Sequence, residues 1–384
     1  MKKVLFITYD GILEPLGYSQ ILSYLIHLSK NNKIHILSVE KEDDLKNKKY
    51  YLQINKLLKQ NNIYWEYLKY SKKFKILILF KLFLKTLKIL LLKKINIAHA
   101  RSYIPAITCY FFRHLFNFKF IFDMRGFWID ERIDWKIWPK KSIKYYLFKF
   151  LEKKIILKSN VIVTLTNDAS IFIKKNFKLN KTTKIYVIPT SIKINNSLIK
   201  KNNKKILSLT HLGAIGTRYD FINVIKFYKY IEKKINTKLL VYNKGEHEII
   251  FKNLNINNVK KNKFNVKYIK PNLISRNINE YSLGIFFPVK GFYLKGYFPT
   301  KLGEFLSNGV PIITCSINKH VDRIIKENKV GIILNLNDDY KKINIIKNIK
   351  GLLNNKTSNR CINTAKKHLN IEYAVKTYEK IYKT

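Results

Sequence analysis

Lys301 and Glu304 fall at the start of a short predicted helix, where a cation, a carboxylate and backbone N–H groups come together. Thr300 is a good N-cap residue after Pro299, and Gly309 suits the left-handed residue that ends a helix. Such a helix start attracts phosphate, the Lys301 ammonium adds positive charge, and the Glu304 carboxylate can accept hydrogen bonds from sugar hydroxyls. The same residues also fit an ordinary junction between a helix and a strand, so this segment alone leaves two interpretations open.

A glycine-containing loop follows the strand predicted over residues 206–212, in the same half of the chain. Its backbone N–H groups precede a helix and suit a diphosphate, to which Arg218 adds a positive charge. The glycine and polar residues of this loop are Gly213, Gly216, Thr217, Arg218 and Tyr219. Because the carboxyl ends of parallel strands meet at one edge of a sheet, this loop and Lys301 can face one ligand, such as a sugar attached to a nucleoside diphosphate.

The first half of the chain also carries polar residues and glycines at predicted strand ends. Asp10, Gly11 and Gly17 follow the first strand, and the two glycines permit tight turns and close approach of a ligand. The spacing is not G-x-G-x-x-G, which weighs against a dinucleotide site. His99 ends another predicted strand, and a lone histidine there is more typical of a packing or hydrogen-bonding residue than of a base.

Charged and aromatic residues crowd the loop after the strand that ends at Asp123. In a cleft, Trp128 can stack on a sugar or isoprenoid while Arg125 holds an anionic group. The alternative is an internal salt-bridge network among Asp130 and the two charged residues that follow it, Glu131 and Arg132. Both interpretations stay open from the residues alone.

Apolar stretches alternate with amphipathic helical patterns along the whole chain. The expected strands are 4–8, 34–39, 63–69, 97–100, 118–123, 161–166, 185–188, 206–212, 238–242, 266–268, 283–288, 312–315 and 331–334. The expected helices are 19–30, parts of 41–62, 75–94, 104–116, 142–158, 221–234, 301–308 and much of the tail after 341, with a polar linker at 193–205. This alternation predicts an α/β protein with two Rossmann-like, doubly wound parallel-sheet domains facing a cleft.

The composition fits a globular protein with an extreme positive charge. The chain has 384 residues, 47% of them apolar, and a formal net charge of +49. Only eight of the 74 basic residues are arginine, and the lysines are scattered, which favours a general composition bias over a nucleic-acid-binding patch. The three cysteines are far apart and predict no disulfide framework or metal site, and a cytoplasmic location is expected.

The segment Lys75–Lys94 combines lysines with aliphatic residues. Its apolar runs are too short for a membrane span. Lys81, Lys85 and Lys88 fall on one helical face, so the helix can lie on an anionic membrane surface. The alternative is a helix packed on the core whose lysines face water.

Five ordered blocks together resemble family 4-type glycosyltransferases of the GT-B fold, in a subgroup of bacterial cell-surface polysaccharide enzymes. The blocks are DGILEPLGYSQ at 10–20, FDMRGFWIDER at 122–132, VIPTS at 187–191, HLGAIGTRY at 211–219 and FPTKLGEFLSNGVPII at 298–313. The resemblance implies an acceptor domain at 1–195, a donor domain at 204–355 and a C-terminal helix at 356–384 that packs back toward the first domain. It also implies a retaining, metal-independent hexosyl transfer from a UDP- or GDP-sugar, without a cofactor, to a glycan or lipid-linked acceptor.

The resemblance also implies roles for individual residues. Arg218, Lys301 and Glu304 would be the catalytic set, with Lys301 neutralising the leaving group and Glu304 binding the nucleotide ribose. The other residues on the donor side would be Gly11, Gly17, Gly213, Thr217, Tyr219, Pro299 and Thr300. The residues on the acceptor side would be Asp10, Arg125, Trp128 and Asp130.

The chain departs from the family pattern at two positions. Gly296 stands where the family often has the first Glu of its Glu-x7-Glu motif, which leaves Lys295 or a backbone N–H to contact the sugar. Ala214 stands where an Arg is usual. The alternatives are a GT-B-fold sugar-nucleotide epimerase and, outside enzymes, a basic scaffold that binds nucleic acid or a membrane.

Overall fold

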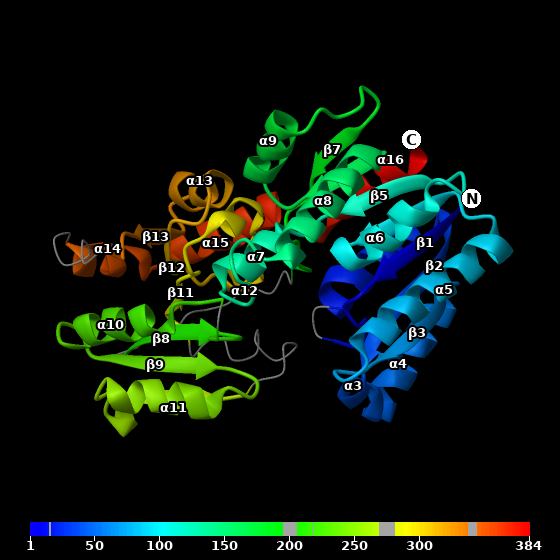
Figure 1. Ribbon diagram of the computed structural model, residues 1–384. Helices are drawn as coiled ribbons and strands as arrows, with labels where there is room; N and C mark the ends of the chain where they lie inside the picture. The colour runs from blue at the N-terminus through cyan, green and yellow to red at the C-terminus, as the bar shows by residue number, and fades with distance from the viewer. Residues whose placement is uncertain (15–16, 195–205, 217, 269–280, 337–343) are drawn as a thin grey trace. The chain divides into compact units, whose positions relative to one another are not determined.

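The computed structural model describes residues 1–14, 17–194, 206–216, 218–268, 281–336 and 344–384. The chain forms two compact units, and Figure 1 follows them from blue at the N-terminus to red at the C-terminus. The first unit contains residues 1–193, 295–297 and 371–384, and the second contains residues 194–294 and 298–370. The predicted linker at 193–205 lies almost entirely outside the described residues.

The first unit is built on a seven-stranded parallel sheet. Its strands are β1 (Lys2–Thr8), β2 (Asn32–Lys41), β3 (Tyr64–Tyr70), β4 (Ile97–Arg101), β5 (Lys119–Asp123), β6 (Val161–Thr164) and β7 (Lys184–Val187). They lie in the order β3-β2-β1-β4-β5-β6-β7, so the winding direction reverses between β1 and β4. Ligands of doubly wound sheets bind at the carboxyl ends of the strands beside such a switch point.

Helices cover both faces of this sheet. They are α2 (Ser23–Leu28), α3 (Glu42–Lys46), α4 (Lys48–Gln60), α5 (Lys75–Lys93), α6 (Tyr103–Phe112), α7 (Trp128–Asp134), α8 (Ile143–Lys158), α9 (Asn167–Asn176) and α16 (Ile371–Lys383), with one π-helical turn at Tyr18–Leu22. Buried residues of α2, α4 and α16 share one core with the strands. Helices α5, α6 and α8 pack on the sheet and on one another on the opposite face (Figure 1).

The last helix belongs to the first unit and is tied to its sheet by two tyrosines. The Tyr378 hydroxyl donates a hydrogen bond of 3.1 Å to Asp123 Oδ2, and the Tyr382 hydroxyl lies 2.7 Å from His99 Nδ1. The sequence placed the start of the returning segment at 356, but helix α15 (Asn355–His368) packs in the second unit and only α16 lies in the first.

The second unit has a six-stranded parallel sheet. Its strands are β8 (Leu207–Leu212), β9 (Thr237–Tyr242), β10 (Phe264–Lys267), β11 (Leu283–Phe286), β12 (Ile312–Cys315) and β13 (Gly331–Leu334), in the order β10-β9-β8-β11-β12-β13. Its helices are α10 (Phe221–Glu232), α11 (His247–Ile256), α12 (Thr300–Leu306), α13 (Lys319–Glu327), α14 (Ile345–Leu352) and α15, with 3-10 turns at Lys261–Lys263 and Phe292–Gly296.

The predicted alternation of strands and helices is confirmed in both units, and so is the α/β class with parallel sheets. Four helices, α7, α9, α11 and α13, are not predicted from the sequence, because each is short and two of them are marked by caps rather than by long apolar periodicity. The Thr166 side chain accepts a hydrogen bond from Ala169 N to start α9, and Asn318 does the same for Val321 N to start α13.

We expect Tyr378→Phe to destabilise the first unit by about 1–3 kcal/mol, because the buried Asp123 carboxylate loses a hydroxyl donor. Urea denaturation of the purified protein measures this change. Tyr373→Phe is the matched control, since Tyr373 lies on the same helix with its ring exposed, and it should change stability by no more than about 0.5 kcal/mol. Equal effects of the two variants would show that the hydroxyl bond does not anchor α16.

Candidate functional site

The Lys301 ammonium is buried at the carboxyl edge of the second sheet. Its Nζ lies 3.1 Å from His211 Nε2, 3.4 Å from the Ala214 carbonyl oxygen and 3.4 Å from the centroid of the Tyr219 ring. A Cβ on Gly213 would stand 3.5 Å from Lys301 Cε. The structure therefore brings together Lys301 and the Gly213 loop, as the strand-end argument predicted.

His211 positions this ammonium and was not among the predicted site residues. Burial, with the Lys301 charge added, holds the pKa of His211 well below its usual range, so the ring is neutral. Its Nδ1 lies 3.1 Å from the Ile285 carbonyl oxygen, which can only accept. Its Nε2 lies 3.2 Å from the Ala214 carbonyl oxygen and 3.1 Å from Lys301 Nζ. We assign the ring proton to Nδ1 because the Lys301 ammonium donates to Nε2. The sequence feature that could have identified His211 is its position two residues before Gly213.

Two charged groups at the start of α12 share this environment. Burial holds the pKa of Lys301 well below its usual range, although Glu304 and Glu246 favour its charged form. Burial also raises the pKa of Glu304, against the pull of Lys301. No described residue makes an ion pair with Lys301 or a hydrogen bond to the Glu304 carboxylate. Among the described residues, Lys301 is thus a cation without a carboxylate in ion-pair contact, and Glu304 is a carboxylate without a hydrogen-bond donor.

The start of α12 differs in detail from the prediction. Pro299, not Thr300, is the N-cap residue, and no side chain caps this end of the helix. Thr300 is the first helical residue, and the helix ends at Leu306, two residues earlier than predicted. Gly309 has the predicted left-handed conformation, with φ of 67°.

A carboxylate already occupies part of the Gly213 loop. Glu246 accepts hydrogen bonds from Ile215 N at 3.0 Å and Gly216 N at 3.1 Å, and Asn243 Nδ2 donates to it at 2.6 Å. The loop amides therefore do not form a fully open anion cradle. Glu246 was not predicted, although its position shortly after the second strand of the sheet was a usable signal.

The remaining donor-side candidates of this loop lie at its end. Arg218 is exposed, and its charge lowers the pKa of Lys301. Tyr219 is buried, forms an isolated bridge with Pro288 and presents its ring to Lys301. Thr217 lies outside the described residues.

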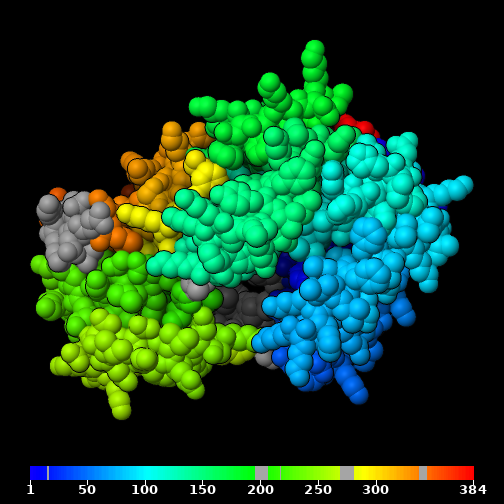
Figure 2. Space-filling view, in the orientation of Figure 1, coloured from blue at the N-terminus to red at the C-terminus, as the bar shows by residue number. Residues whose placement is uncertain are grey.

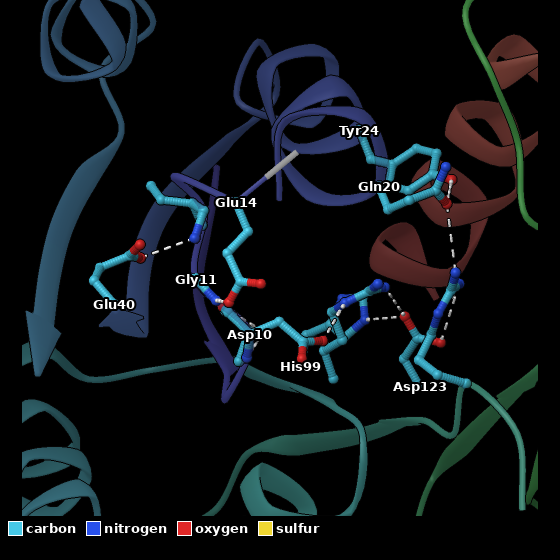
Figure 3. A network of polar contacts seen from close by, with 12 residues as sticks. Asp10, Gly11, Glu14, Gln20, Tyr24, Glu40, His99 and Asp123 are labelled. Carbon is cyan, nitrogen blue, oxygen red and sulfur yellow. Dashed lines mark hydrogen bonds and ion pairs between the residues drawn. The ribbon is translucent and has the colours of Figure 1, made fainter. Parts of the chain in front are cut away.

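A second polar cluster surrounds Asp123 at the carboxyl edge of the first sheet (Figure 3). Arg101 Nη1 and His99 Nε2 lie 3.7 Å from Asp123 Oδ2, and Arg125 Nη1 lies 3.8 Å from Oδ1. Burial alone would raise the pKa of Asp123, but the neighbouring Arg125, His99 and Arg101 together hold it at about 2. His99 is thus a buried hydrogen-bonding residue, and burial lowers its pKa.

Arg125 and Asp10 are the predicted acceptor-side residues that converge on this cluster. Arg125 adopts a left-handed backbone with φ of 56°, and its Nη2 lies 3.5 Å from Gln20 Oε1. Asp10 is exposed, and its Oδ2 lies 3.6 Å from Arg101 Nε. Neither guanidinium makes a close hydrogen bond to Asp123, so N–H groups of both remain for a further acceptor.

Trp128 and Asp130 lie in a different environment. Trp128 packs against Tyr103, Trp138 and Phe148, with ring centroids 5.4–5.8 Å apart, and Arg132 lies over its ring. Asp130 is buried and pairs with Lys149, which also pairs with Glu152. A salt-bridge network therefore holds Asp130, but its cation is Lys149 from α8 rather than the neighbouring Arg132.

The two glycines of the first loop are required by the packing of the loop itself. A Cβ on Gly17 would stand 2.3 Å from the Gly11 carbonyl oxygen, and Gly11 N donates to the Glu14 carboxylate. The N–H groups of the two residues after Gly11 bind Glu40 at 2.8 and 3.1 Å. Glu40, at the end of the second strand, thus occupies this loop as Glu246 occupies the loop of the other unit.

Gly296 has a physical reason for standing where the family often has Glu. A Cβ on Gly296 would lie 2.9 Å from Phe127 Cδ2 and 3.1 Å from Gly126 Cα. Thr166 Oγ1 donates to the Lys295 carbonyl and holds the same segment. A side chain at position 296 would have to displace the Phe127 ring and the Gly126 loop, which disfavours a glutamate there.

Comparison with known proteins identifies the fold of the chain. No protein-family model and no curated protein matches the chain in sequence. Solved structures that match along the whole chain include sucrose-phosphate synthase from Thermosynechococcus elongatus, a glycosyltransferase from Rickettsia africae and HepE from Anabaena in complex with UDP and glucose. Their TM-scores are 0.73, 0.67 and 0.68, at 10%, 15% and 10% identity, and the match covers 100% of this chain and 98%, 98% and 100% of theirs.

The chain has the GT-B fold of glycosyltransferases. The predicted fold is confirmed, since the neighbours have this fold and both sheets are parallel. At these identities the likeness establishes the fold only. In GT-B terms, the Lys301 cluster lies in the C-terminal unit and the Asp123 cluster in the N-terminal unit.

We expect Gly296→Ala to destabilise the protein by about 1–3 kcal/mol, because the new methyl group overlaps Phe127 and Gly126. Gly351→Ala is the matched control, since a Cβ there meets nothing within 4 Å and the residue lies in α14. The control should be neutral or stabilising by up to about 1 kcal/mol. Thermal denaturation compares the two, and a Gly296→Ala variant as stable as the control would refute the packing explanation.

We also expect Asp123→Asn to lower the free energy of unfolding at pH 7 by about 3–5 kcal/mol, because two buried guanidinium groups lose their counter-charge. The folded pKa of Asp123 is about 2, below the unfolded value of about 3.9, so its stabilising effect is present above pH 4. It is lost as the pH falls toward 2. Denaturation at pH 7, 4 and 3 should show the two proteins converging in acid, and a gap independent of pH would contradict this account.

Proposed function

We propose that this protein is a glycosyltransferase that moves a sugar from a UDP- or GDP-sugar to a glycan or lipid-linked acceptor. The observation that carries the proposal is the buried Lys301 ammonium, held by His211 and Tyr219 with no carboxylate in ion-pair contact among the described residues. A buried cation of this kind is costly unless an anion joins it. A nucleoside diphosphate supplies that anion.

The chemistry follows from where charge develops. When the bond between the sugar and the diphosphate breaks, negative charge grows on the leaving phosphate. The Lys301 ammonium, with Arg218 at the loop end, stabilises this charge more strongly in a poorly solvated site than in water. Glu304 accepts hydrogen bonds from the ribose hydroxyls, and the acceptor hydroxyl passes its proton to the departing phosphate.

The finer features of the proposal come from the family resemblance. They are a retaining, metal-independent hexosyl transfer of the family 4 type, without a cofactor, with Arg125 and Asp10 on the acceptor side. The proposal further places the enzyme in the cytoplasm on the inner face of the membrane, in the synthesis of a cell-surface polysaccharide. It favours transfer over epimerisation, because the histidines at the two clusters, His99 and His211, are both buried and engaged by protein partners.

Calorimetric titration with UDP and GDP tests the donor site. We expect at least one of them to bind, and Lys301→Met to weaken binding by roughly tenfold or more, which corresponds to about 1.4 kcal/mol. Binding should take up protons and weaken as the pH rises through the Lys301 pKa, since the diphosphate raises a pKa that burial has lowered. Titration in two buffers of different ionisation enthalpy measures this uptake.

The control is Lys326→Met, which removes an exposed lysine from α13 of the same unit and should leave the affinity unchanged. Glu304→Gln should also weaken nucleotide binding and slow the release of UDP or GDP from the sugar nucleotide. Wild-type protein that binds neither nucleotide, or a Lys301→Met variant that binds as tightly as wild type, would refute the proposal.

A further inference from the structure

Helix α5 exposes an apolar stripe where a surface helix normally exposes polar residues. Leu77, Phe80, Leu84 and Leu91 are exposed and follow the spacing i, i+3, i+7 and i+14, while Ile78, Leu82 and Ile89 are buried on the opposite side. Ile76 is 84% exposed. Lys81 and Lys88 are exposed as predicted, whereas Lys85 is partly buried and pairs with Glu66. Aliphatic and aromatic side chains share the outer face with these lysines.

Helix α8 exposes a second stripe of the same kind. Ile143, Tyr146, Leu147 and Phe150 are exposed at the spacing i, i+3, i+4 and i+7, and Ile143 is 88% exposed. Helix α4, on the other face of the sheet, is an internal reference, because Leu52 is its only exposed large apolar residue. Helix α11 also exposes Ile249, Phe251 and Ile256, but these do not follow the i, i+3, i+4 and i+7 spacing of the α8 stripe.

The two stripes belong to one face of the N-terminal unit. Helix α6 packs against both α5 and α8, and it adds the exposed Phe111 to the surface. Figure 2 shows these helices, coloured from blue through cyan to green, on the surface turned toward the viewer. We call the exposed surface of α5, α6 and α8 the apolar face.

The charges around the apolar face are mainly positive, and the partly exposed Glu66 of β3 is paired with Lys85 of α5 at 3.1 Å. The segment 71–94 contains no acidic residue, and Lys81 and Lys88 are exposed beside the stripe of α5. Lys140, Lys141 and Lys144 are exposed at the start of α8, whose only acid, Glu152, is buried. A second copy of this face would bring like charges together, whereas an anionic surface would complement it.

We infer that the apolar face docks on the surface of an anionic lipid bilayer, with its aliphatic and aromatic side chains in the interface and its lysines among the lipid phosphates. No helix among the described residues is long and apolar enough to cross a bilayer, so the contact is peripheral. The membrane contact deepens the proposed function but does not depend on it. Only the further statement that the bilayer carries a lipid-linked acceptor rests on the proposed function.

Cosedimentation with vesicles of phosphatidylcholine, with and without phosphatidylglycerol, tests the inference on the full chain. We expect binding to the anionic vesicles only, weakening as salt rises. Leu147→Glu/Phe150→Glu and Leu84→Glu/Leu91→Glu should each lower the partition coefficient by about tenfold. The matched control is Ile249→Glu/Phe251→Glu on α11, which changes two exposed apolar residues of the C-terminal unit and should bind like wild type.

Three results would overturn the inference: no binding to anionic vesicles, equal losses in the α8 and α11 variants, or a wild-type dimer that the stripe variants convert to monomer. Light scattering on the same samples detects the last, which would identify a second copy as the occupant. UDP titration of each variant separates the two proposals. Binding to vesicles without binding of UDP would support the membrane contact and refute the proposed transferase. Binding of UDP without binding to vesicles would support the transferase and refute the membrane contact.

Discussion

The buried carboxylate of Asp123 is the charge on which the N-terminal unit depends. Two guanidinium groups, Arg101 and Arg125, lie beside it within the protein, and neither has another buried anion to balance it. The same carboxylate accepts the hydroxyl bond of Tyr378 and thereby ties the last helix of the chain to the sheet. The Asp123 carboxylate therefore balances the two guanidinium charges, attaches α16 to the sheet and holds Arg125 at the strand ends.

The two units satisfy the backbone N–H groups of the loop after their first strand in the same way. In each, the loop after the first strand would leave consecutive backbone N–H groups without partners, and a glutamate at or shortly after the end of the second strand accepts hydrogen bonds from two of them. Glu40 does this in the first unit and Glu246 in the second. These carboxylates shape the loops, while Lys301 has no carboxylate in ion-pair contact among the described residues. The contrast supports the proposal that Lys301 binds the anionic part of the donor.

Steric and electrostatic constraints also explain the departures from the family pattern. Gly296 is crowded by Phe127 and Gly126, and under the proposed function a group other than a glutamate at this position contacts the sugar. Glu304, one turn into α12, keeps a carboxylate with no described hydrogen-bond partner. Under the proposed function, the donor is held mainly through its diphosphate and ribose, and the apolar face brings the enzyme to the bilayer that carries a lipid-linked acceptor.

The sequence by itself determined the α/β class, most strands and the meeting of Lys301 with the Gly213 loop. Apolar periodicity is local, and the strands of a parallel sheet necessarily bring their carboxyl ends to one edge. Only the tertiary structure decided which groups those ends receive from elsewhere: Glu40, Glu246, the tautomer of His211, the Tyr378 bond to Asp123 and the packing of Trp128. These depend on partners distant in sequence, and the exposed stripe of α8 depends on which side of the helix the core leaves uncovered.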